Sequence, residues 1–196
     1  GDGNNWTTVG TYEVDELRNT VNYPETQSEG ICSTTKFDEV TAQDVRVVVY
    51  ETGPATMNDN ENRLQIMELE LLNSSDENVA AGAVPTVSDS FESGTQWRAS
   101  NLTDGDYGVE SDAGYTSNIL DYGNEYLNIE SKPVTVDLHF DTPVTFSSVR
   151  LYARTGIESI YHGICPNYAK TYSVQTSSDG GKTWTDISGA SKVDAG

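Results

Sequence analysis

The chain has 196 residues, with 17 glycines and 11 tyrosines, a composition that predicts an all-β protein rich in turns. It carries 31 acidic residues against 11 lysines and arginines, for a net charge of −20. Nucleic acid and anionic membrane surfaces are therefore disfavoured as partners. No run of about twenty apolar residues is present, so we expect no membrane insertion.

Strand signals, in which apolar and polar residues alternate or β-branched residues cluster, recur along the chain. They fall at 44–50, 63–72, 133–140, 146–154 and 170–177. Turn-forming sequences lie between them, at 51–62, 140–143 and 177–182. The sequence contains no convincing amphipathic helix of three turns. Many short strands at this spacing predict a sandwich or a barrel.

A polar stretch at 73–78, NSSDEN, is the one evident joint in the sequence. The segment before it has too few strands for a closed core, and the segment after it ends just after a strand begins. Because the chain starts at Gly1 without a methionine, we expect it to be excised from a longer protein.

Four stretches follow a recognisable order: NVAAGAVPTVSDSF at 78–91, WRASNLTDGDYG at 97–108, PVTVDLHFDTPVTFSSVRLYAR at 133–154 and NYAKTYSVQTSSDGGKTW at 167–184. Together they resemble the first part of an F5/8 type C (discoidin) domain, a family that includes the family 32 carbohydrate-binding modules. The rest of that pattern stands at the beginning of the chain, as WTTV at 6–9, FDEVTAQDVRVVVY at 37–50 and RLQIMELELL at 63–72. The resemblance implies an all-β, galactose-binding-domain-like jelly-roll sandwich whose sequence order is circularly permuted.

The resemblance divides one domain, 1–196, into two segments. Residues 1–73 resemble the C-terminal part of a discoidin-like domain, 78–196 resemble the N-terminal part, and 74–84 join them. A second arrangement also fits, in which the ends of two tandem modules dock or exchange between chains. We favour one closed sandwich, because the termini of compact domains usually lie near each other on the surface.

The resemblance also implies a structural calcium ion at the loop LTDGD. Calcium takes carboxylate and backbone carbonyl oxygens from irregular loops. The main expected ligands are Asp104 and Glu68, and the further ones are Asn101, Asp106 and Ser111, with Asn101 and Asp106 acting through backbone carbonyls. The alternative is that Asp104 and Gly105 form only a turn.

A glycan site is implied at ARTGIESIYHG, residues 153–163. Sugar-binding members of the family place an arginine at the end of this strand and a polar residue before a glycine on the next loop, a pattern that Arg154 and His162 match. The arginine offers a planar fork of donors to hydroxyl groups, and Tyr161 offers a face to a pyranose ring. Glu158 lies in the same loop. The alternative is that Glu158 pairs with Arg154 and that Tyr161 packs inward.

Cys32 and Cys165 lie in no C-x-x-C pair, so they suggest no metal site. They are either two buried thiols or one disulfide closing a long loop. In the permuted arrangement the two cysteines precede neighbouring strands, which makes the disulfide a plausible interpretation. The turn sequences GDGNNWTTV and SDGGKTWTDI occur near the two ends of the chain, and we expect only one of Trp6 and Trp184 to occupy the core.

No G-x-S-x-G, H-E-x-x-H or P-loop sequence is present, and with 31 acidic residues a facing carboxylate pair carries no information. We expect a calcium-stabilised, non-catalytic carbohydrate-binding module for galactose-type or N-acetylgalactosamine-type glycans. It would belong to an extracellular or surface bacterial glycoside hydrolase, with the glycan and neighbouring domains as partners. The alternatives are a structural or protein–protein interaction module of a surface protein, and an enzyme of another class.

Overall fold

The computed structural model describes residues 19–22, 31–108, 113–154 and 165–195. The part of the chain that it describes is all-β, with one short 3-10 helix, η2 (Ala99–Thr103). No helix in these residues is long and apolar enough to cross a membrane. The paired strands are antiparallel throughout the described residues.

The strands, in chain order, are β1 (Asn19–Asn22), β2 (Ile31–Thr52), β3 (Glu61–Asn62), β4 (Gln65–Ile66), β5 (Glu68–Leu72), β6 (Thr86–Val87), β7 (Tyr115–Thr116), β8 (Asp121–Tyr122), β9 (Leu127–Asn128), β10 (Val134–Ala153), β11 (Ala169–Ser177), β12 (Thr185–Asp186) and β13 (Val193–Asp194).

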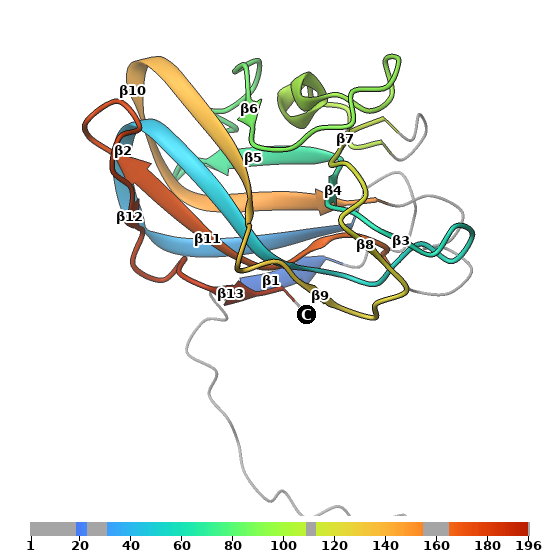
Figure 1. Ribbon diagram of the computed structural model, residues 1–196. Coiled ribbons are helices and arrows are strands. Elements are labelled where there is room, and N and C mark those ends of the chain that lie inside the picture. The colour runs from blue at the N-terminus through green and yellow to red at the C-terminus, as the bar shows by residue number, and fades with distance from the viewer. Residues whose placement is uncertain (1–18, 23–30, 109–112, 155–164, 196) are drawn as a thin grey trace, which may run out of the picture.

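Two long strands, β2 and β10, pair along most of their lengths and curve together, as Figure 1 shows. Their register shifts between His139 and Val144, which divides the pair into two parts. In the part of β10 from Val144 onward, β5 flanks β10 and β1 flanks β2. We call these four strand segments the β5 half. In the part of β10 up to His139, β6 flanks β10 and β11 flanks β2. We call these strand segments the β11 half.

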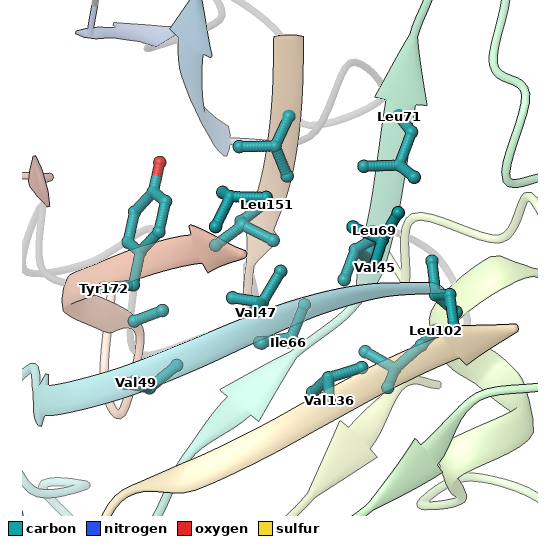
Figure 2. Packing of buried hydrophobic residues seen from close by; sticks show 14 of the residues in the cluster. Val45, Val47, Val49, Ile66, Leu69, Leu71, Leu102, Val136, Leu151 and Tyr172 are labelled. Atoms are coloured by element: carbon teal, nitrogen blue, oxygen red, sulfur yellow. The ribbon is translucent and has the colours of Figure 1, made fainter. Parts of the chain in front are cut away.

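The core lies between these two halves. Alternate residues of β2 and β11 in the β11 half, such as Val47 and Tyr172, share one buried cluster with Leu69, Leu71 and Leu151 of the β5 half. Figure 2 shows these side chains converging from separate strands. Because each strand buries every second residue against the facing strands, the arrangement is consistent with a β-sandwich.

The strands predicted at 44–50 and 170–177 are confirmed within β2 and β11. The turn predicted at 140–143 is wrong, because β10 runs through it as a single strand. The shift in register at this place leaves residues out of the regular ladder, and such an irregularity tolerates a proline that lacks an amide hydrogen. The strand predicted at 63–72 is interrupted, and the amide of Met67 donates instead to the carbonyl of Tyr152, at 2.9 Å.

The polar stretch at 73–78 forms a tight turn. The side-chain oxygen of Asn73 accepts hydrogen bonds from the amides of Ser75 and Glu77, at 2.9 and 3.0 Å, as asparagine commonly does in turns. Strands before and after this turn share one sheet, since β2 lies between β10 and β11 and β5 pairs with β10. Both segments of the chain therefore contribute to the same core.

Trp184 packs in a turn rather than in the core. Its indole nitrogen donates to the carbonyl of Gly181, at 3.0 Å, and the guanidinium of Arg46 lies 4.1 Å from its ring centroid. The same guanidinium binds the carboxylate of Asp137 through two hydrogen bonds of 2.6 Å. Trp6 lies outside the described residues, so the expectation that one of the two tryptophans fills the core stays a prediction.

Tyr172 links the two halves through a buried hydroxyl group. Its oxygen lies 2.5 Å from the hydroxyl oxygen of Thr35, and the ring is fully buried. We expect Tyr172→Phe to lower the free energy of unfolding by about 1 kcal/mol, because the buried hydrogen bond between the two hydroxyl groups is lost. Urea unfolding measures this loss. Tyr126→Phe, at an exposed tyrosine, is the control, and an equal effect of the two variants would contradict the prediction.

Candidate functional site

The outward face of the β5 half carries an unusual set of buried polar side chains. In β5, Leu69 and Leu71 point into the core, so Glu68 and Glu70 point to the opposite face. Both glutamates are nevertheless buried. The face is covered in part by the loop that follows η2, because η2 packs against β5 and Tyr107 packs on the same face.

Glu68 is the most deeply buried acid of this face. Its side chain has no exposed surface, and its Oε1 atom has no hydrogen-bond partner. Its Oε2 atom accepts a hydrogen bond from the amide of Gly105, at 3.3 Å. Burial, with the negative charges of Asp104 and Glu70, raises the pKa of this carboxyl group from 4.5 to about 8.

The loop that faces Glu68 is held by its own acidic side chains. The carboxylate of Asp104 accepts from the amide of Asp106, and the carboxylate of Asp106 accepts from the amide of Gly108, each at 2.9 Å. Gly105 has a φ of +83°, a conformation in which glycine is not strained. The sequence therefore folds into a tight turn that places Asp104 and the Gly105 amide against Glu68.

The side chain of Asn101 holds the backbone around this loop. Its side-chain NH2 group donates to the carbonyls of Thr95, Gln96 and Gly114, at 2.9, 3.1 and 3.2 Å. The side-chain NH2 group therefore holds the backbone on either side of the loop. The ligand that the sequence predicts from Asn101 is its backbone carbonyl. Ser111 lies outside the described residues, so its predicted role stays a prediction.

The residues present fit a calcium ion. A fully buried carboxylate oxygen without a partner costs free energy, and a cation beside Glu68 and Asp104 would relieve that cost and the repulsion between the two acids. Within the described residues no group of three or more acidic, histidine or cysteine side chains is placed to hold a metal. Backbone carbonyls and water would therefore have to supply the remaining ligands, as calcium sites allow.

A second cluster lies beside Glu68 on the same face. The carboxylate of Glu70 accepts hydrogen bonds from Arg150 at 3.1 Å, from Tyr152 at 3.3 Å and from Tyr107 at 3.3 Å. The rings of Tyr107 and Tyr152 stack with centroids 4.4 Å apart. Burial raises the pKa of both phenols, so each keeps its proton to donate to Glu70.

Arg154, which follows the last residue of β10, lies at the rim of this face. Its guanidinium carbon is 5.4 Å from the ring centroid of Trp97. The indole is half-buried and packs against the cluster of Cys32, Met67 and Tyr152, so it gives the arginine a fixed support. The other residues predicted for the glycan site, Glu158, Tyr161 and His162, lie outside the described residues.

Cys32 is buried on the outward face of the β5 half, beside Tyr152 and Met67. Cys165 is partly exposed and lies just before β11. The disulfide between them stays a prediction.

The structure thus brings together Glu68 and Asp104, as the resemblance implies, and it adds partners that sequence reasoning missed. Trp97 contacts Arg154, a contact that the sequence does not predict. The cluster of Glu70 with Arg150 and two tyrosines was not foreseen. The alternation of MELELL gave the one available signal, since it places both glutamates on a single face.

Comparison of the chain with protein-family models, with curated proteins and with solved structures gave no match.

Proposed function

We propose that this chain is a non-catalytic carbohydrate-binding module, with a permuted jelly-roll fold similar to that of galactose-binding domains. The observation that supports it best is the placement of Arg154 over Trp97 at the rim of the β5 half. A sugar ring presents a patch of C–H groups and a border of hydroxyl groups. An indole supplies an apolar surface, and a guanidinium held on it supplies donors in a fixed plane.

The neighbouring groups would keep this rim rigid. Tyr107 stacks on Tyr152, which packs with Trp97, and Glu70 holds both phenols. A binding site held by packing and by hydrogen bonds loses little conformational entropy when a ligand docks. Arg154, with the predicted residues of the following loop, would then select hydroxyl groups of a galactose-type or N-acetylgalactosamine-type sugar.

Calcium is proposed as the structural cofactor of the loop beside this rim. The ion would be held by Glu68 and Asp104 and would satisfy the Oε1 atom that has no partner. The same loop continues to Tyr107, so an ion at Glu68 would fix one side of the rim. Its role is to order the loop, and no chemical step is assigned to it.

The proposed permutation is supported by the way in which the two segments interleave. β2 and β5 come from residues 1–73, whereas β10 and β11 come from 78–196, and these strands alternate in one sheet. A closed domain built from swapped segments requires this interleaving. The tight turn at 73–78 would be the place at which the family's two ends are joined.

The module would tether a secreted or surface-bound bacterial glycoside hydrolase to its glycan. Single-site affinity is expected to be weak, because each sugar hydroxyl exchanges hydrogen bonds with water for hydrogen bonds with protein. Tethering compensates for weak affinity by raising the local concentration of the neighbouring catalytic domain. Its partners would be the glycan and the other domains of the parent protein.

The test is a glycan array with galactose-terminated and N-acetylgalactosamine-terminated glycans, followed by calorimetry with the free sugars. We expect Arg154→Ala to weaken binding at least tenfold, because a charged donor pair is lost. Arg154→Lys keeps the charge but not the planar fork, so it should recover only part of the affinity.

Lys36→Ala removes a positive charge from an exposed position of β2 and serves as the matched control. The proposed site is wrong if Arg154→Ala binds as the unchanged chain does. The proposed function is wrong if the unchanged chain binds none of these glycans in calcium-containing buffer.

A further inference from the structure

A second surface, which does not include Arg154, combines exposed aromatic rings with a fixed ion pair. It lies on a narrow ribbon made of 61–66 and 115–122, in which β3 pairs with β8 and β4 pairs with β7. Between these short strands the amide of Ser117 donates to the carbonyl of Leu64, at 2.9 Å, and the amide of Leu120 donates to that of Asn62, at 2.8 Å. The two ladders are therefore parts of one continuous pair.

The two faces of this ribbon differ sharply. Asn62 and Leu64 are fully buried, so the alternating residues Glu61 and Arg63 lie on the outward face. The guanidinium of Arg63 donates two hydrogen bonds, of 2.7 and 2.9 Å, to one carboxylate oxygen of Glu61, Oε2. It also donates to the carbonyl of Ser117, at 3.1 Å. Both side chains are thus held in place. The side chain of Arg63 is 14% exposed, and that of Glu61 is 19% exposed.

This geometry leaves one acceptor open. The hydrogen bonds of the Glu61 carboxylate to Arg63 all go to Oε2, and Oε1 has no hydrogen-bond partner among the described residues. Since the carboxylate is fixed by two donors and its charge is balanced by Arg63, Oε1 is a pre-organised acceptor on a side chain that stays partly exposed. A hydroxyl group is a suitable donor to such an atom.

Each member of the ion pair has an exposed aromatic residue as a neighbour. The guanidinium of Arg63 lies 5.2 Å from the ring centroid of Phe91, which is 47% exposed. Tyr122 is the direct cross-strand partner of Glu61, so their side chains share a face, and it is 57% exposed. The outward face therefore presents a row: an aromatic ring, a held ion pair with an open acceptor, and a second aromatic ring.

We propose that this row, formed by Phe91, Arg63, Glu61 and Tyr122, is a second glycan-contacting surface that recognises neutral sugar chains. The rings would pack on apolar faces of two sugar units, and Glu61 would accept from a hydroxyl group between them. A net charge of −20 disfavours anionic chains. A protein partner would favour a contiguous apolar core, whereas here polar groups separate the rings. The inference rests on the proposed carbohydrate-binding function.

The experiment uses the whole chain on an array of neutral galactose-containing glycans of one to six sugar units. We expect Phe91→Ala with Tyr122→Ala to weaken binding of the longer glycans about tenfold, since each stacked ring contributes to affinity. A glycan of one sugar unit should bind this double variant as tightly as it binds the unchanged chain, through the Arg154 rim. Tyr122→Phe keeps the ring and should retain most of the affinity.

Tyr126→Ala is the matched control, because this tyrosine is similarly exposed and contacts Lys170 instead. Thermal unfolding checks that all variants remain folded. Suppose that the double variant of Phe91 and Tyr122 binds long glycans as the unchanged chain does, while Arg154→Ala still loses binding. This result would overturn the second surface and leave the proposed function standing. Failure of the unchanged chain to bind any glycan would overturn both.

Discussion

Glu68→Gln is expected to remove the response of the protein to calcium while it stabilises the metal-free state at pH 8. In the folded chain the carboxyl group of Glu68 is fully buried and its pKa is raised to about 8. Glutamine keeps the shape and the neutral charge of the protonated acid. We therefore expect metal-free Glu68→Gln to be more stable than the unchanged protein by a few kcal/mol at pH 8, because the folded acid takes up a proton that the unfolded acid does not.

The dependence on pH follows from proton binding. Between the ordinary pKa of 4.5 and the raised value of about 8, the folded metal-free protein binds a proton at Glu68 that the unfolded chain does not. Its stability therefore falls as pH rises through this window and levels off above about pH 8. Calcium requires the deprotonated carboxylate, so its affinity should rise over the same window.

Thermal unfolding with calcium or with a chelator, at pH 5.5 and pH 8, separates these effects. With calcium at a hundredfold excess over its Kd, the unchanged protein should gain about 2.7 kcal/mol, or roughly 5–10 °C in Tm for a chain of this size. Glu68→Gln should gain little. Glu39→Gln, at an exposed glutamate of β2, is the control, and an equal calcium response in all three proteins would refute the ligand assignment.

The sequence predicted the fold best where the alternation of residues is regular. The valines of 44–50 and the tyrosine and valine of 170–177 lie in β2 and β11 as expected, because a strand with one face on the core needs apolar residues at every second position. The prediction failed at 140–143, where FDTP has the composition of a turn. There the pairing of β2 with β10 keeps the chain extended, and the bend is taken up by a shift in register.

The candidate site was predicted only in part, for a physical reason. Glu68 and Asp104 came from a resemblance of short sequence patterns, and the structure places them side by side through the Gly105 amide. The contact of Trp97 with Arg154 depends on how a loop folds over a sheet, and the sequence contains no periodic signal for such packing. The same holds for Glu61 and Tyr122, which are partners across strands that lie far apart in the chain.

Asn167 shows how a single loop residue can set the geometry of a site that its sequence neighbourhood does not reveal. It is fully buried, with a φ of +58°. Its side-chain oxygen accepts from the amide of Arg63 at 3.0 Å, and its side-chain nitrogen donates to the side-chain oxygen of Gln65 at 3.3 Å. Its backbone amide donates to the carbonyl of Pro54, at 2.9 Å. The ribbon that carries Arg63 is therefore fixed to the segment before β11.

We expect Asn167→Ala to be strongly destabilising, by about 3 kcal/mol, because it leaves the Arg63 amide without its acceptor and places alanine in a left-handed conformation. Asn167→Gly accepts this conformation and should lose less, which separates the backbone contribution from that of the hydrogen bonds. Asp76→Ala, at an exposed residue with a φ of +58°, is the matched control. Urea unfolding measures all three. If Asn167→Ala costs no more than Asp76→Ala, the buried hydrogen bonds do not hold the ribbon, and the fixed geometry of Arg63 and Glu61 needs another source.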